Sequence, residues 1–122
     1  MVYDLEERVA KFGEETIRLC KIINLNEFTR PLVNQLIRSA TSVGANYMEA
    51  NQGSSARDFK NKIRICQKEA NETKHWLRMM VSADTSKIEQ CRKLWREAQE
   101  LTLIFAKISR SCDLKIKNSD II

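Results

Sequence analysis

Apolar residues recur along four stretches of the chain at alternating steps of four and three, the spacing that places them on one side of an α-helix. The most regular stretch is residues 55–82, whose inward side is predicted to consist of Phe59, Ile63, Cys66, Ala70, Thr73, Leu77 and Met80. Ser55 opens this stretch and Asp58 follows three residues later, an acidic variant of the capping box. The pattern therefore predicts a long, capped helix that packs against other helices.

The predicted helix over residues 55–82 has two further sides. Its outward side carries positive charge and no carboxylate, and consists of Arg57, Asn61, Arg64, Lys68, Asn71, His75 and Arg78. The third side mixes acids with large apolar residues, and consists of Lys62, Ile65, Glu69, Glu72, Trp76 and Met79. Four apolar residues exceed what the core of one subunit needs, and we expect them in a homo-oligomer interface: Ile65, Trp76, Met79 and Trp95. The alternative is a wider core stripe within one subunit.

The same spacing predicts three more helices, over residues 4–23, 31–51 and 85–110. Asp4 and Thr85 are the predicted N-caps of the first and the last, and Pro31 lies in the first turn of the middle one, where a missing N–H costs nothing. Four amphipathic helices of comparable length with short connections predict an all-α fold, an antiparallel up-down-up-down four-helix bundle.

The bundle is expected to be one domain over residues 1–110, followed by a C-terminal tail, residues 111–122, that is disordered or docks on a neighbour. The composition agrees, because 43% of the 122 residues are apolar and there are only three Gly and one Pro. The N-terminal residues do not form a signal peptide, and no apolar run approaches the roughly 20 residues of a membrane span. We therefore expect a cytoplasmic protein with no membrane contact.

Positive charge is concentrated in the second half of the chain. Residues 55–82 contain seven Lys or Arg and three Asp or Glu, a net charge of +4 within a chain total of +5. Basic patches favour polyanions. The residues expected to bind RNA or DNA are Arg57, Lys60, Arg64, Lys68, Lys74, Arg78, Arg92, Lys93 and Arg96. The alternative is an ordinary solvated helix face.

Six polar residues flank the core stripes of the second and third predicted helices: Arg38, Ser42, Asn46, Glu49, Glu69 and Glu72. Buried polar groups need partners, so we predict a hydrogen-bonded network that fixes helix register or subunit geometry. The alternative is a ligand site lined by Asn46 and Glu49, although no nucleophile or positioned base accompanies them. Between these polar positions the second helix has small residues such as Ala40 and Gly44, which allow another backbone to come close.

The sequence offers little for catalysis or metal binding. Glu72 and His75 have the Glu-x-x-His spacing of di-metal helical bundles, but such a site needs two of these pairs and the chain has one histidine. No serine or cysteine has a partner base, and no Gly-rich phosphate loop is present. The four cysteines are far apart and are interpreted as reduced, apolar side chains. We expect no cofactor, no metal and no enzymatic activity.

Three segments resemble a known family, the four helix bundle proteins encoded in intervening sequences of bacterial 23S rRNA genes. These segments are residues 3–19, residues 35–50 (QLIRSATSVGANYMEA) and residues 59–77 (FKNKIRICQKEANETKHWL). Two motifs carry the resemblance most specifically. One is the pattern Arg38, Ser39, Ser42, Asn46 and Glu49, and the other is the Lys-Glu-Ala-x-Glu-Thr run from Lys68 to Thr73. The resemblance extends over roughly residues 3–110.

The resemblance implies an antiparallel four-helix bundle that assembles as a homopentamer around a central channel. It also implies a relation to the accessory variability determinant of diversity-generating retroelements, a basic pentamer that binds nucleic acid and a reverse transcriptase. We therefore expect a non-enzymatic homo-oligomer that binds nucleic acid through its basic face. The alternative is an oligomeric adaptor for a protein partner such as a reverse transcriptase.

Overall fold

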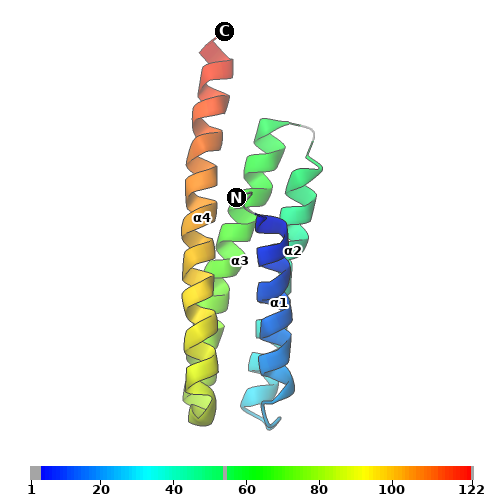
Figure 1. Ribbon diagram of the computed structural model, residues 1–122, viewed down its shortest axis with the longest axis vertical. Helices are drawn as coiled ribbons and strands as arrows, with labels where there is room; N and C mark the ends of the chain where they lie inside the picture. The colour runs from blue at the N-terminus through cyan, green and yellow to red at the C-terminus, as the bar shows by residue number, and fades with distance from the viewer. Residues whose placement is uncertain (1–3, 54, 122) are drawn as a thin grey trace.

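The computed structural model describes residues 4–53 and 55–121, and over these residues it contains helices and no strand (Figure 1). The elements are the α-helices α1 (Leu5–Lys21), α2 (Thr29–Asn51), α3 (Ala56–Ala83) and α4 (Ile88–Ile121), with a short 3-10 helix, η1 (Thr85–Lys87), before α4. None of the helices in the described residues combines the length and apolarity that a membrane crossing requires.

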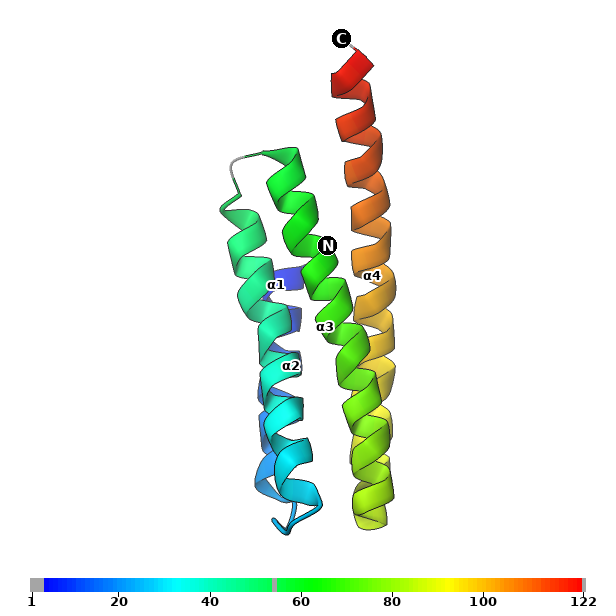
Figure 2. The same cartoon turned by 180° about the vertical axis from the view of Figure 1, so that it is seen from behind.

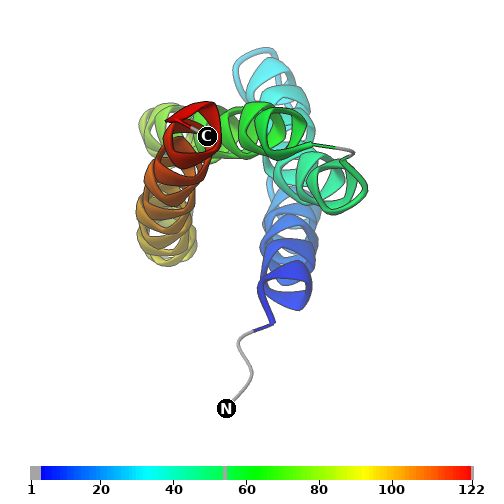
Figure 3. The ribbon, with the colours of Figure 1, turned by 90° about the horizontal axis from the view of Figure 1, so that it is seen from above.

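Helix α3 is the centre of the arrangement, because its contacts with α2 and with α4 are the most extensive in the molecule. Contacting residues of α2 and α3 run in opposite directions along the two helices, as Glu49 meets Lys62 and Ser39 meets Thr73. Helix α1 packs mainly on α2 and touches α4 much less. Seen along the bundle, α1 and α4 accordingly stand apart from each other (Figure 3).

The core contains large side chains from all four α-helices. Phe12 of α1, Leu36 of α2, Leu77 of α3 and Phe105 of α4 are each at most 2% exposed. Small residues bring α1 and α2 close together, because a Cβ atom on Gly44 would lie 3.7 Å from the backbone oxygen of Val9. The apolar stripes in the sequence thus meet in one interior, which leaves the polar sides of the helices facing solvent.

Side-chain caps fix the starts of α1 and α3. The Asp4 carboxylate accepts a hydrogen bond from the backbone N–H of Glu7 over 3.1 Å, and the Ser55 hydroxyl accepts one from Asp58 over the same distance. The prediction that Thr85 caps the fourth helix is wrong. The residue before it, Asp84, accepts a hydrogen bond from the backbone N–H of Ser86, and the chain then makes the 3-10 turn η1 before α4 begins.

The predicted end of the fourth helix at Arg110 is also wrong, since α4 continues to Ile121. Tertiary contacts hold the first turn of this extension, because Cys112 is buried and Asp113 forms an ion pair with Lys60 of α3. Beyond that turn the helix projects past the α2–α3 connection (Figures 1 and 2). The tail that we expected to be disordered or to dock on a neighbour is therefore helical as far as Ile121, and Ile122 lies outside the described residues.

Candidate nucleic-acid interface

Arg38 of α2 binds both acids on the α2-facing side of α3. Its guanidinium donates hydrogen bonds to the carboxylates of Glu69 over 3.0 Å and Glu72 over 2.7 Å, and its Nε donates to the side-chain oxygen of Gln35. The hydrogen bond from Arg38, together with its charge, lowers the pKa of Glu72 below the ordinary range, and the same contact raises the pKa of Arg38. Both acids of α3 beyond its first turn are thus directed toward α2.

Within the described ranges, no hydrogen bond or ion pair links Arg38 to Ser42, Asn46 or Glu49 of the predicted polar network. Asn46 donates a hydrogen bond to the backbone oxygen of Ser42 in the same helix over 2.8 Å. Glu49 forms an ion pair with Lys62 near the other end of the α2–α3 contact. The structure therefore separates the six residues into an Arg38 cluster, a Glu49–Lys62 pair, and an Asn46 side chain bound within its own helix.

The outward side of α3 is exposed along its whole length. We define the outer stripe as the seven residues of this side: Arg57, Asn61, Arg64, Lys68, Asn71, His75 and Arg78, all of which are exposed. Within the described part of the chain, Arg64, Lys68 and Arg78 have no carboxylate at ion-pairing distance, while Glu69 and Glu72 are bound by Arg38. The outer stripe is therefore a cationic edge open to solvent.

Three of the other predicted cations lie along the crevice between α3 and α4. Lys60 pairs with Asp113. Lys74 donates to the side-chain oxygen of Gln99 and also lies over the Trp95 ring, 5.2 Å from its centroid. Arg92 lies with Arg78 in a hollow of about 340 Å³ whose lining is Leu77, Arg78, Val81, Ser82, Ile88, Cys91, Arg92 and Trp95. We call the outer stripe and this crevice together the α3–α4 face.

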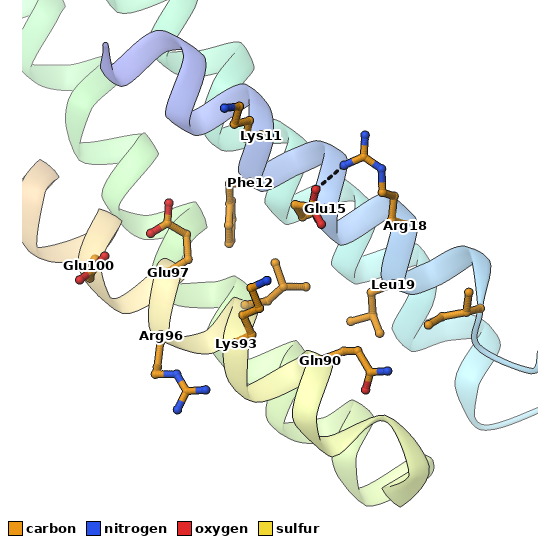
Figure 4. A pocket seen from close by; sticks show the side chains of 12 residues that line it. Lys11, Phe12, Glu15, Arg18, Leu19, Gln90, Lys93, Arg96, Glu97 and Glu100 are labelled. Atoms are coloured by element: carbon orange, nitrogen blue, oxygen red, sulfur yellow. Dashed lines mark hydrogen bonds and ion pairs between the residues drawn. The ribbon is translucent and has the colours of Figure 1, made fainter. Parts of the chain in front are cut away.

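Lys93 and Arg96 belong to a different surface. They line a groove of about 680 Å³ between α1 and α4, into which Phe12 of α1 points (Figure 4). On the α4 wall of this groove, Glu97 accepts a 2.7 Å hydrogen bond from Arg8 of α1. The nine cations predicted to bind nucleic acid are thus divided, with seven on the α3–α4 face and two on the α1–α4 groove.

The four residues expected in an oligomer interface do not form one surface. Ile65, Trp76 and Met79 are half-buried, and Trp76 packs against the core. The indole N–H of Trp76 is buried and has no hydrogen-bond acceptor among the described residues. Trp95 is 40% exposed and lies on α4 beside Lys74, on the side of α3 away from Arg38. The Trp76 side of α3 is therefore partly used within the subunit.

The cysteines and the histidine form no reactive cluster in the part of the chain that the structure describes. Burial raises the pKa of Cys66 to about 12 and that of Cys20 and Cys91 to about 11, so these thiols stay protonated at neutral pH. No group of three His, Cys, Asp or Glu residues in the described ranges could hold a metal ion. Glu72 is bound by Arg38 while His75 is exposed on the outer stripe.

Fold and surface define a class: a small, all-α protein with four helices and a cationic long helix. The chain belongs to the family of 23S rRNA-intervening sequence proteins, whose family model matches residues 4–107. A solved structure from Bacteroides thetaiotaomicron VPI-5482, described as a protein of unknown function from the S23 ribosomal protein family, has a TM-score of 0.78. The two sequences are 32% identical over 87% of this chain and 98% of that one. No curated protein matches this chain.

Proposed function

We propose that this chain is a non-enzymatic, antiparallel helical bundle that assembles as a homo-oligomer and binds the phosphate backbone of RNA or DNA through the α3–α4 face. The arrangement around Arg38 carries the proposal. Because Arg38 holds Glu69 and Glu72 toward α2, neither of these acids forms an ion pair with Arg64, Lys68 or Arg78 of the outer stripe. A cationic edge of this kind attracts a polyanion.

The cations are spread along the helix, which suits a backbone rather than a compact ligand. Arg57 and Arg78 mark the two ends of the outer stripe, about 32 Å apart at the rise of an α-helix. Phosphate contacts by Lys and Arg fix the position of a nucleic acid without selecting a sequence. We therefore expect binding that depends strongly on salt and weakly on sequence.

Assembly of several copies would strengthen this binding, because linked sites add avidity that one modest patch lacks. Exposed apolar residues support an oligomer. Ile22, Leu25 and Phe28, at the α1–α2 connection, are each more than half exposed. The family resemblance favours a homopentamer. The related retroelement branch favours nucleic acid as the ligand and a reverse transcriptase as a protein partner.

The experiment is a salt titration of binding to a labelled RNA 20-mer and a DNA 20-mer, followed by fluorescence anisotropy, with light scattering to give the mass of the free and bound protein. The test variant is Arg64→Gln/Lys68→Gln/Arg78→Gln. The control is Lys11→Gln/Lys21→Gln/Arg30→Gln, which removes the same charge from exposed positions on α1 and α2. Gln is a good helix former, so both variants keep the bundle.

The test variant is expected to bind at least about tenfold more weakly than the control, since several phosphate contacts are lost. The slope of log affinity against log salt should fall by about 0.7–0.9 for each lost contact. Equal losses in the two variants, or an affinity that does not change with salt, would overturn the nucleic-acid proposal. A monomeric mass would overturn the proposed oligomer.

A protein adaptor is the second candidate, and the groove between α1 and α4 favours it. Its lining includes Phe12, Leu19 and Leu94, and its volume of about 680 Å³ is large enough for side chains of a partner. An adaptor of this kind would keep its partner after charge removal on the outer stripe. The Arg64→Gln/Lys68→Gln/Arg78→Gln variant therefore separates the two functions.

A further inference from the structure

Trp95 is a large aromatic side chain on the α3–α4 face that is not buried in the core. It is 40% exposed, whereas the other tryptophan, Trp76, packs against the core cluster. Leaving an indole partly in water forgoes the free energy that its burial would give. Such a side chain next to a hollow is a candidate contact for a flat, apolar ligand group.

The surroundings of Trp95 are cationic. The ammonium of Lys74 lies 5.2 Å from the ring centroid, and Arg78 and Arg92 line the same hollow as the indole. Two acids of the described residues lie near the hollow. Glu89 is 3.7 Å from Arg92 in an exposed pair, which holds Arg92 only weakly, and the charge of Asp84 acts on Cys91 in the lining, where it helps to raise the pKa of that thiol. None of the residues that line the hollow is acidic. The ligand group expected here is therefore aromatic and belongs to an anion.

An unpaired base attached to a phosphate backbone has this chemistry. Single-stranded nucleic acid is bound by a positive groove that follows the backbone, combined with aromatic side chains on which bases stack. In a duplex the bases are stacked and paired inside the helix, so they cannot reach an indole in a crevice between two helices. A surface that combines Trp95 with the outer stripe should therefore distinguish the two forms.

We propose that Trp95 is a stacking platform for an unpaired base, and that the α3–α4 face binds single-stranded nucleic acid in preference to duplex. This inference rests on the proposed function. Arg78 and Arg92 bind the phosphates on either side of the stacked base. Arg64 and Lys68 of the outer stripe bind phosphates further along the strand. Lys74 fixes the ring from one side through its cation–π contact and its hydrogen bond to Gln99.

The test uses the full chain with Trp76→Phe, which leaves Trp95 as the only tryptophan and the only indole fluorophore. Three ligands are titrated into this protein at one salt concentration: a single-stranded RNA 12-mer, the corresponding RNA duplex, and an abasic 12-mer with the same number of phosphates. The indole emission and the anisotropy of a label on the ligand are both recorded. We expect the single strand alone to quench the indole emission, and to bind at least about fivefold more tightly than the abasic strand.

The variant Trp95→Leu removes the ring and keeps an apolar side chain. Its affinity for the single strand should fall to its affinity for the abasic strand. Its affinities for the abasic strand and the duplex should equal those of the protein that keeps Trp95. The matched control is Leu103→Ala, an exposed apolar position on α4 outside the hollow, and it should leave the preference unchanged. Circular dichroism checks that both variants fold.

The outcomes separate the two proposals. If none of the three ligands binds, the proposed function fails. If all three bind equally and the indole emission does not change, phosphate binding stands and the stacking proposal is overturned. If Trp95→Leu instead changes the mass of the protein in solution without changing ligand preference, Trp95 contacts a second copy, and this also overturns the stacking proposal.

Discussion

The guanidinium of Arg38 on α2 lies 3.0 Å from the carboxylate of Glu69 on α3, and that carboxylate belongs to a side chain only 10% exposed. A charge this far from water needs a partner, and Arg38 supplies it. The contact also affects the outer stripe, because Glu69 and Glu72 pair with Arg38 and neither lies at ion-pairing distance from Arg64, Lys68 or Arg78. Arg38 therefore contributes both to the packing of α2 on α3 and to the positive charge of the outer stripe.

The first prediction concerns the stability of this contact. Replacing Arg38 with Met keeps much of the side-chain volume and leaves the Glu69 carboxylate unpaired. We expect Arg38→Met to lower the free energy of unfolding by about 1–3 kcal/mol, measured by urea denaturation at pH 7. The matched control is Arg18→Met, which breaks an exposed pair with Glu15 and should cost under about 0.5 kcal/mol. Equal losses in the two variants would show that Arg38 has no structural importance.

The second prediction concerns acid. Because Arg38 lowers the pKa of Glu72 below its ordinary value of 4.5, the unfolded chain takes up the proton at a higher pH than the folded chain does. The ionised carboxylate therefore contributes stability above that ordinary value, and the contribution is lost as the pH falls through the folded-state pKa. Glu72→Gln should be less stable than the original chain at pH 7, and the difference should shrink as the pH is lowered from about 5 to 3.

The measurement is urea denaturation of the original chain and of the Glu72→Gln variant at pH 7 and between about pH 5 and 3. The control is Glu14→Gln on α1, an exposed residue, which should change the free energy of unfolding by less than about 0.5 kcal/mol at pH 7. A Glu72→Gln difference that stays constant down to pH 3 would contradict the linkage to Arg38.

The third prediction concerns the thiols. Burial raises the pKa of Cys66 to about 12 and that of Cys20 and Cys91 to about 11, so almost no thiolate is present at pH 7.5. Iodoacetamide should label these three residues at least about tenfold more slowly in the folded protein than in urea, as measured by peptide mass spectrometry. An added cysteine at an exposed position, Asn61→Cys, should react quickly in the folded protein. Fast labelling of Cys66 in the folded state would show that α3 opens locally.

The fourth prediction concerns the contact between α1 and α2. A Cβ atom on Gly44 would meet the backbone oxygen of Val9 at 3.7 Å, an ordinary van der Waals distance. Gly44→Ala should therefore fit, and it should raise the free energy of unfolding by about 0.5–1 kcal/mol because Gly is a poor helix former. Gly44→Leu should lower it, since the extra atoms would push α1 away from α2. Urea denaturation of both variants tests the closeness of the two helices.

The sequence predicted well those features that depend on neighbours within one helix. The caps at Asp4 and Ser55 are hydrogen bonds to a backbone N–H three residues later, and the structure contains both. The exposed outer stripe, from Arg57 to Arg78, follows from helical spacing alone, and every one of its residues is exposed. Local periodicity is enough to assign the sides of a helix.

Other features depend on how the helices are placed relative to one another, and spacing alone did not reveal them. Lys93 and Arg96 carry the same charge as Arg92, yet they lie on the side of α4 that faces α1. Because Glu49 and Arg38 flank the same stripe, the spacing predicts one network for both, but in the structure Glu49 pairs with Lys62 of α3. The tertiary packing of the helices determines where Lys93 and Arg96 lie and which residue pairs with Glu49.

The last prediction concerns the end of α4, where sequence and structure place the boundary of the bundle differently. Residues after Arg110 have no clear amphipathic pattern, but Cys112 is buried and Asp113 pairs with Lys60. A chain that ends after Arg110 loses both contacts and should be less stable by roughly 1–3 kcal/mol, mainly from the lost apolar burial. A chain that ends after Asp113 keeps them and should lose less, because Leu114 is 64% exposed and Ile116 is only half-buried against α3. Urea denaturation of the two truncated chains gives the comparison, and equal stabilities would show that the bundle ends at Arg110.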